Sequence, residues 1–381
     1  MNELSAANFS QCITDASSAY SLPPVCYTSR EAVDVEIEQI FRRKWIGVGR
    51  SDMVAGPGDF ITLDIAGQQI ILLRDKEGTL RAFANVCRHR GARLVDGEGS
   101  CKGLRCPFHS WFYGLDGRLV SAPHMDAVAG FEKSDFGLIA YQAEERLGFA
   151  FVCLDAEADG LQAQLGDVDK FHKPWPMEDL VTVRRQEMEV DCNWKLFLEV
   201  FNEYYHLPFV HPDSIDSVYC PPDPAEKVDG AFATQFGRTD GTGGLLEESQ
   251  GSALPAMPGL TGNAHEGARY TWLFPNMTFA ANTDALWCYE AYPLGPDKCK
   301  VVQSACFHPE TAARADFKEK SVAYLDRLDA ALAEDIPALV NQQRGMECPD
   351  AQPGRFQPDL EPNVASFAKW YAESLEEAGG V

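Results

Sequence analysis

The feature that most constrains this chain is a pair of short segments that each bring one cysteine and one histidine close together. The segments are Cys87-Arg-His89 and Cys106-Pro-Phe-His109, with 16 residues between them. Two thiolates and two imidazoles suit a [2Fe–2S] centre in which histidines hold one iron and cysteines hold the other. Zinc also binds two cysteines and two histidines, but finger-type sites put both cysteines on one arm and both histidines on the other. The mixed arms favour the iron–sulfur centre, with structural zinc as the alternative.

Length and composition limit the architecture and location of the chain. Its 381 residues are enough for two domains with separate cores, and a 45% hydrophobic fraction is ordinary for a globular protein. No run of about 18 apolar residues is present to span a bilayer, and the first dozen residues lack the basic and apolar regions of a secretory signal. Twelve cysteines are scattered without the spacing of a disulfide scaffold, so most are expected to be buried free thiols. We therefore expect a cytoplasmic protein.

The net charge of −24 argues against two classes of partner. Nucleic acid phosphates and anionic membrane surfaces would both be repelled, so we expect the chain to bind neither. The acidity would suit a basic redox partner, or it reflects solubility in a salty cell, and the sequence favours neither reading.

The first part of the chain is expected to form an N-terminal arm with a helix, 1–45, and then an antiparallel β domain, 46–155. Thr28-Ser-Arg-Glu31 matches a capping box, and apolar residues on one face carry the helix to about Arg43. Short β-branched or alternating runs separated by turn residues follow at 60–65, 69–74, 80–86, 111–113 and 118–120. An Asp-Gly dipeptide between the last two runs is typical of hairpins. The cysteine and histidine arms are expected at loop tips of this domain.

Residues 156–182 are expected to be a linker, and residues 183–381 a second, larger domain. Its strand patterns lie at 183–190, 269–274, 277–281, 286–294 and 300–307, and its helix patterns at 193–206, 311–332 and 335–343. Residues 212–268 are rich in Gly, Pro, Asp and Glu, which indicates either a lid over a pocket or a disordered surface excursion. The order of elements predicts an α+β fold.

A second candidate metal site lies near the end of the predicted helix 193–206. His206 and His211 are five residues apart, which is about 140° around a regular helix, so they could not easily share a metal there. Pro208 is expected to end or kink the helix and let the chain bring His211 back toward the same point. Two histidines and one carboxylate form the facial triad of non-heme Fe(II) oxygenases, which leaves positions open for O₂ and substrate.

The text around both sites resembles the alpha subunits of Rieske non-heme iron oxygenases, also called ring-hydroxylating oxygenases. The matching text is C-R-H-R-G at 87–91, C-P-F-H-S-W-F-Y-G at 106–114, N-W-K at 193–195 and N-E-Y-Y-H-L-P-F-V-H-P at 202–212. The family usually has Gly where Ser110 stands. The resemblance implies a small antiparallel β Rieske domain and a larger catalytic domain of the helix-grip type.

The resemblance also supplies a third iron ligand and a bridging residue. The family places an Asp on a later helix shortly before Gln-Arg-Gly, and here Asp335 has that place, with Glu334 as the alternative. Both acids could instead be helix N-terminal residues favoured by the macrodipole. Glu203, three residues before His206, is expected to share its helix face and bond its imidazole. It matches a family Asp that links a cluster histidine of a neighbouring subunit to an iron histidine. Glu at this place resembles the subset acting on quaternary ammonium compounds, such as carnitine, choline and glycine betaine monooxygenases, unless the swap has no meaning for substrate.

The resemblance implies a terminal oxygenase component in a homotrimer. Electrons from NAD(P)H would arrive through a separate flavin or iron–sulfur reductase, pass the [2Fe–2S] Rieske cluster and reach a mononuclear Fe(II), where O₂ is used to hydroxylate or oxidatively demethylate a small substrate. A quaternary ammonium substrate is expected, and the alternatives are an aromatic-ring hydroxylating oxygenase and a Rieske electron-transfer protein without a catalytic iron. Aromatic residues on the second-domain strands are candidates for a cation–π cage, a slot for a ring, or core packing: Trp272, Phe274, Phe279, Trp287, Tyr289 and Tyr292.

Overall fold

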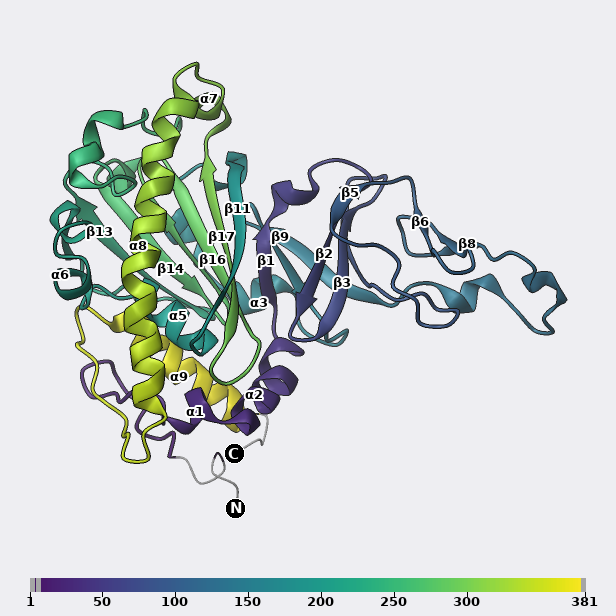
Figure 1. The fold of residues 1–381 in the computed structure, drawn as a ribbon, viewed down its shortest axis with the longest axis horizontal. Coiled ribbons are helices and arrows are strands. Elements are labelled where there is room, and N and C mark those ends of the chain that lie inside the picture. The colour runs from purple at the N-terminus through teal and green to yellow at the C-terminus, as the bar shows by residue number, and fades with distance from the viewer. Residues whose placement is uncertain (1–3, 5–7, 378–381) are drawn as a thin grey trace. The chain divides into compact units, whose positions relative to one another are not determined.

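The structure, a computed structural model, describes residue 4 and residues 8–377. The chain divides into two compact units, Arg42–Ala158 and a larger unit that combines the residues before and after it. Each unit is built around its own β-sheet (Figure 1). The expected α+β fold is confirmed, with a small antiparallel β domain and a larger domain of sheet and helices. None of the helices in the described part of the chain has the length and hydropathy needed to span a bilayer.

The smaller unit contains a seven-stranded sheet in the order β1-β10-β9-β4-β3-β2-β5 and a three-stranded sheet in the order β6-β7-β8. The first sheet consists of β1 (Ile46–Arg50), β2 (Asp59–Ile65), β3 (Gln68–Arg74), β4 (Leu80–Ala84), β5 (Glu98–Ser100), β9 (Ala140–Arg146) and β10 (Phe149–Cys153). The second consists of β6 (Leu104–Arg105), β7 (Phe112–Tyr113) and β8 (Leu119–Ser121). The two cysteine and histidine arms lie in the loop after β4 and in the loop between β6 and β7.

Turn chemistry sets the register of β2 against β3. Ala66 and Gly67 are the two residues between these strands, and their φ angles are 49° and 88°. Two consecutive residues with positive φ form a type I′ turn, whose twist matches that of the flanking strands. Ile65 therefore pairs with Gln68, and residues 70–73 of β3 are buried in the core. The predicted Asp-Gly hairpin is also confirmed, because β7 and β8 pair antiparallel around it.

The larger unit contains a seven-stranded antiparallel sheet in the order β11-β17-β16-β15-β14-β13-β12. Its strands are β11 (Val181–Val190), β12 (Tyr219–Pro222), β13 (Phe232–Thr239), β14 (Gly267–Leu273), β15 (Met277–Ala281), β16 (Leu286–Pro293) and β17 (Cys299–Phe307). Its helices are α1 (Val25–Thr28), α2 (Arg30–Glu36), α3 (Leu161–Leu165), α4 (Val168–His172), α5 (Trp194–Phe201), α6 (Leu207–Val210), α7 (Pro309–Ala312), α8 (Phe317–Met346) and α9 (Pro362–Glu377). The long helix α8 crosses the sheet in the view of Figure 1.

Three predictions for this unit were wrong. The segment 212–268 contains β12 and β13 rather than only a loop, and six consecutive residues of β13 are buried, so the strand shows no alternation. The predicted helices 311–332 and 335–343 are the short α7 and one continuous α8 that includes Pro337. The predicted helix 193–206 ends at Phe201. A lid role for the rest of 212–268 stays a prediction.

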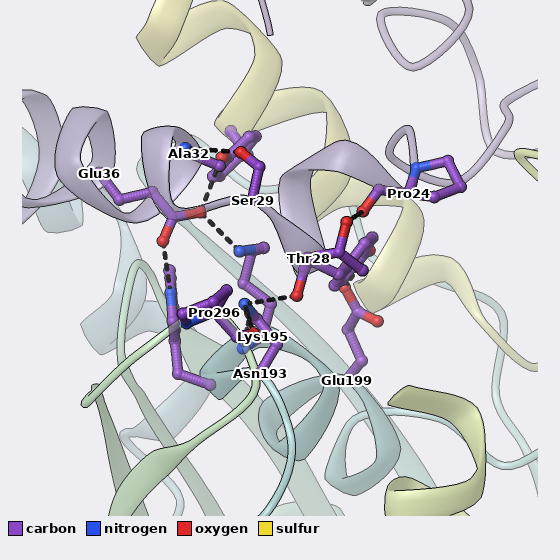
Figure 2. Close-up of polar contacts among 12 residues, drawn as sticks. Pro24, Thr28, Ser29, Ala32, Glu36, Asn193, Lys195, Glu199 and Pro296 are labelled. Atoms are coloured by element: carbon purple, nitrogen blue, oxygen red, sulfur yellow. Dashed lines mark hydrogen bonds and ion pairs between the residues drawn. The ribbon is translucent and has the colours of Figure 1, made fainter. Parts of the chain in front are cut away.

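The N-terminal helix begins one residue later than the capping box indicated. Ser29 is the N-cap, and its Oγ accepts a hydrogen bond from the backbone N–H of Ala32 at 2.9 Å (Figure 2). Thr28 instead ends α1, where its Oγ1 donates to the carbonyl of Pro24 at 3.0 Å. The segment ends in a π-helical turn at Phe41, whereas the predicted end was at about Arg43.

A buried ion pair joins this N-terminal segment to α5. The side chains of Glu36 and Lys195 are both 0% exposed, and Lys195 Nζ donates to Glu36 Oε1 at 2.5 Å (Figure 2). Trp194 Nε1 and Tyr371 Oη each donate to the same carboxylate at 2.7 Å. Because α5 leads into the second candidate metal site, this pair holds in place the element from which that site extends.

Replacing Lys195 by methionine is expected to destabilise the larger unit strongly. The variant leaves the Glu36 carboxylate buried without its cation, and removing one partner of a buried pair costs about 3–5 kcal/mol. Urea unfolding followed by circular dichroism measures the change. The control is Arg30→Met, which breaks an ion pair with Asp34 whose side chains are 68% and 60% exposed. That change should cost about 0.5 kcal/mol or less, and an equally small loss for Lys195→Met would contradict the expectation.

Candidate metal centres and pocket

The first candidate centre has a buried sulfur side and an exposed nitrogen side. Cys87 and Cys106 are 2% and 1% exposed, whereas His89 is half-buried and His109 is exposed. The two imidazole rings lie with centroids 4.6 Å apart. The hydroxyl of Tyr113 lies 3.3 Å from Cys87 Sγ and accepts the backbone N–H of Arg88 at 3.1 Å. The thiols thus lie in the domain core and the imidazoles at its surface.

This arrangement fits a two-iron cluster better than a single zinc. The burial of Cys87 raises the pKa of its thiol, and the neighbouring Cys106 thiol raises it further, so the pair of thiolates requires a nearby positive charge. A mononuclear zinc needs all four donors around one point. Among the described residues, no three of the donor atoms of Cys87, His89, Cys106 and His109 all lie within 4.8 Å of one another. The sulfur pair and the nitrogen pair are suited to two different irons.

The second candidate centre is built on a turn between two helices. α5 ends at Phe201, residues 202–206 form turns, and α6 follows. Pro208 lies in the first turn of α6, so it begins a new helix instead of ending the old one, and the predicted kink was wrong. The chain nevertheless turns between the two helices and brings the two histidines together, as expected. Their ring centroids lie 5.1 Å apart.

Both imidazoles present Nε2 to one carboxylate of α8. Asp335 Oδ1 lies 2.9 Å from His211 Nε2 and 3.6 Å from His206 Nε2. These donor atoms form the group within 4.8 Å of one another that could hold one metal ion. Asp335 Oδ1 is buried and lies against these two ring nitrogens. A buried carboxylate oxygen that faces two imidazole nitrogens fits a metal ligand.

The other ring nitrogens are held by two further carboxylates. His206 Nδ1 contacts Glu203 Oε1, and His211 Nδ1 lies 2.6 Å from Glu334 Oε2. Ser214 Oγ also donates to Glu334 Oε2 at 2.7 Å. Glu203 makes its contact from the turn after α5, not from a shared helix face, and accepts the backbone N–H of His206 at 3.0 Å. Such partners fix the ring and the tautomer of a ligating histidine.

The geometry separates the roles of the two adjacent acids on α8. Glu334 faces Nδ1 of His211, while Asp335 faces Nε2 of both histidines. Both acids lie in the interior of α8, so the helix N-terminal explanation for them was wrong. Burial lowers the pKa of His211, but Asp335 and Glu334 raise it, and the net shift is upward. An excess of carboxylate around two imidazoles is an environment suited to a divalent cation.

A pocket that opens to solvent adjoins His206, His211 and Asp335. The other lining side chains come from α5, β14, β16 and α8 and the segments after α5, and most are aromatic or apolar: Phe197, Val200, Phe201, Tyr204, Leu207, Ile215, Tyr219, Tyr270, Tyr289, Arg327, Ala331 and Leu332. Concave sites of this kind, apolar with a few polar groups, are typical of small-molecule binding.

Of the six strand aromatics considered from the sequence, Tyr289 lines this pocket. Trp272 and Phe274 pack instead against Phe367 of α9, with ring centroids 4.0 Å and 5.4 Å from it, and Phe279 lies 5.0 Å from the ring of His172. No sequence pattern marked the pocket residues on α5, on β14 and in the segment predicted as a lid, or Arg327, as lining a pocket. Strand alternation places Tyr270 and Trp272 on one face but does not say which end of that face is hollow.

Comparisons with known proteins cover both units. Residues 177–377 match the family model described as ring hydroxylating alpha subunit (catalytic domain), and residues 44–132 match the Rieske [2Fe–2S] domain. The carnitine monooxygenase oxygenase subunit of Acinetobacter baumannii is 37% identical over 203 residues, which are 52% of this chain and about half, 55%, of that relative. The glycine betaine monooxygenase oxygenase subunit of Pseudomonas aeruginosa is 27% identical over 390 residues, 94% of this chain and 89% of the relative.

Solved structures show the same architecture. The quaternary ammonium Rieske monooxygenase CntA in complex with its substrate L-carnitine has a TM-score of 0.80 at 25% identity, covering 96% of this chain and 98% of that chain. Naphthalene 1,2-dioxygenase from Rhodococcus sp. has a TM-score of 0.76 at 23% identity, covering 93% and 94%. The second likeness shows the fold alone.

Proposed function

Because this chain belongs to the ring-hydroxylating alpha subunits, the oxygenase components of the Rieske non-heme iron family, we propose that it is a terminal monooxygenase for a small quaternary ammonium compound. In each turnover one atom of O₂ enters a C–H bond beside the nitrogen and the other leaves as water, with two electrons and two protons consumed. A hydroxylated N-methyl group then leaves as formaldehyde, which completes an oxidative demethylation.

The observation that carries the proposal is the convergence of His206, His211 and Asp335 at the wall of an aromatic pocket. These residues would hold the mononuclear iron, and Cys87, His89, Cys106 and His109 would hold the cluster. When bound, the cluster supplies electrons and the iron activates O₂. A protein that only carried electrons would not need the second ligand set, so that alternative is disfavoured.

The chain's own residues orient the ligands and shelter the reaction. Glu203 and Glu334 hold the Nδ1 side of the two histidines, so that Nε2 of each ring is free to ligate. The apolar and aromatic wall excludes water from the substrate and strengthens electrostatic contacts inside the pocket. Specificity therefore depends on the pocket side chains rather than on the metal.

The partners and location of the enzyme are further parts of the proposal. Electrons would come from NAD(P)H through a separate flavin or iron–sulfur reductase, because the sequence has no nucleotide-binding fingerprint. Glu203 would connect to a cluster histidine of a neighbouring subunit in a homotrimer, in keeping with the inter-subunit electron transfer described for a quaternary ammonium Rieske monooxygenase of the same fold. All twelve cysteines are free, which suits the reducing cytoplasm.

Two observations support an ammonium substrate over an aromatic ring. Glu203 stands where most of the family has Asp, and this departure resembles the quaternary ammonium subset. The relatives named above act, by their names, on carnitine and glycine betaine, whereas the naphthalene dioxygenase shares only the fold.

The test is turnover of a small panel by anaerobically reduced, iron-replete protein that is then given O₂. The panel contains glycine betaine, choline, carnitine, stachydrine and several aromatic acids. Formaldehyde or another aldehyde is expected from at least one ammonium compound, and none from the Asp335→Ala variant as control. Diols or phenols from the aromatic acids alone would overturn the proposal and assign ring hydroxylation.

A further inference from the structure

Arg327 is a buried cation that has no carboxylate partner among the described residues. Its side chain is 4% exposed and belongs to α8, eight residues before Asp335. Among the described residues its contacts are the hydroxyl of Tyr219, to which Nη2 donates at 3.2 Å, the hydroxyl of Tyr270, and the face of Trp287, whose centroid lies 4.8 Å from the guanidinium carbon. None of these groups carries a negative charge at neutral pH.

Two other buried cations of the larger unit are each paired with a carboxylate. Lys195 pairs with Glu36, and Arg269 pairs with Glu226. Removing a charge from water is costly unless an opposite charge compensates for it. A guanidinium also has five N–H donors in a planar fork that matches a carboxylate. The hydroxyl groups leave part of this fork unused, so Arg327 is suited to an anion that enters from outside the protein.

Arg327 lines the same pocket as the candidate iron ligands. A helix rises about 1.5 Å per residue, so Arg327 lies roughly 12 Å from Asp335 along the axis of α8. Ala331 and Leu332, which lie between them in sequence, also line the pocket. The pocket therefore extends from the guanidinium group of Arg327 to the candidate iron ligands, where O₂ chemistry is proposed. This length suits a small molecule.

The same pocket has a continuous aromatic wall. The ring of Phe201 lies 5.3 Å from Tyr270 and 4.8 Å from Tyr289, and Tyr219 lies 6.0 Å from Tyr270 and 6.3 Å from Tyr204, all between centroids. The faces of such rings attract a methylated ammonium group by about 0.5–2 kcal/mol each. One pocket thus offers a surface for a quaternary nitrogen and a cation for an anionic group.

We propose that the substrate is a betaine, a quaternary ammonium compound that also carries a carboxylate, and that Arg327 binds this carboxylate. The inference rests on the proposed function and narrows it. A choline-type alcohol has the methylated nitrogen but lacks the group that Arg327 would pair with.

The first test uses unaltered holoprotein and ligands that differ only in the anionic group. Dissociation constants are measured by calorimetry under anaerobic conditions for glycine betaine against choline, and for carnitine against its methyl ester. The carboxylates should bind about 100-fold more tightly, because a desolvated charge pair is broken in the other compounds. Equal affinities within each pair would overturn the inference, whatever the behaviour of any variant.

The second test measures ligand affinities for variants of Arg327, which lines the pocket, and of Arg184, which does not. Arg327→Gln should weaken glycine betaine about 100-fold and choline by less than about threefold. Arg327→Lys should recover part of the loss, since it keeps the charge without the fork. Arg184→Gln is the matched control. Arg184 of β11 pairs with Asp329 of α8, the helix that also carries Arg327, but Arg184 does not line the pocket. Its affinities should stay at the wild-type values.

The outcomes separate the inference from the proposed function. Oxidation of ammonium compounds with no difference between betaine and choline would leave the proposed function and overturn the role of Arg327. A loss of both ligands in Arg327→Gln, with normal affinities in Arg327→Lys, would also overturn it, since the residue would then act on pocket structure. Turnover of aromatic acids alone would overturn both.

Discussion

The Asp335→Ala variant is expected to lose its mononuclear iron and nearly all product formation while it keeps the cluster. In the described part of the chain, Asp335 supplies the carboxylate that faces Nε2 of both His206 and His211. Two imidazoles alone bind iron weakly in water, so the iron content should fall from about three to about two per chain. We expect turnover to fall by at least about 1,000-fold. Metal analysis gives the iron content, and the visible and EPR spectra of the cluster serve as the internal standard.

Glu334→Gln is the matched control for Asp335→Ala, because Glu334 is adjacent in sequence but bonds His211 from the Nδ1 side. Loss of such a supporting carboxylate weakens metal binding or activity by about 10–100-fold. Iron should therefore be retained when it is supplied in excess. Retention of iron by Asp335→Ala together with its loss from Glu334→Gln would reverse the assignment of the two acids.

The Glu203→Gln variant is expected to bind both metal centres and to fail in passing electrons between them. Glu203 holds Nδ1 of His206 and, in the proposed homotrimer, would reach a cluster histidine of the neighbouring subunit. Glutamine keeps the length of the side chain but removes its charge. The rate at which O₂ and substrate reoxidise the reduced cluster, followed by stopped-flow absorbance, should fall about 100-fold or more.

A carboxylate of α5, Glu199, provides the control for Glu203→Gln. Glu199 lies four residues earlier and bonds the hydroxyl of Tyr27 at 2.7 Å, and burial raises its pKa to about 7. Glu199→Gln removes part of a negative charge at neutral pH, but the hydrogen bond of Glu199 goes to Tyr27 and not to a candidate iron ligand, so the variant should reoxidise at the wild-type rate. Reoxidation of Glu203→Gln at that same rate, with full iron content, would remove Glu203 from the electron path.

The sequence predicted most of the sheet and the identity of the candidate ligands. Strand patterns at 277–281 and 286–294 match β15 and β16 almost residue for residue, because aromatic and β-branched residues mark the strands and turn residues mark their ends. β13 was missed because it lies in the segment 212–268, where many Gly, Pro, Asp and Glu residues indicate a loop. α8 was divided because Glu334 and Asp335 interrupt its apolar pattern, and these acids face the candidate iron site instead of solvent.

What the sequence could not supply is relative orientation. The resemblance favoured Asp335 over Glu334 as the third ligand but did not say where either side chain points. Adjacent residues on a helix point about 100° apart, and the structure separates the two acids by the nitrogen that each one faces. Arg327 is similar, because an arginine in a helix is most often a surface residue. Its lack of a carboxylate partner becomes visible when the surrounding residues are in place.

If Arg327 binds the substrate as proposed, the continuous α8 would set the length of the substrate that the pocket accepts. Arg327 and Asp335 belong to one uninterrupted helix. The distance between the proposed carboxylate-binding residue and the candidate iron ligand is therefore fixed by the number of helical residues between them and not by flexible loops. Moving the arginine one turn earlier, to the position of Ala323, would lengthen the accepted molecule by about 6 Å. Inserting a single residue between positions 327 and 335 would turn the anchor about 100° out of the pocket. Enzymes of this design could change from short to long substrates by one exchange on a helix, with the metal centre and the sheet unchanged.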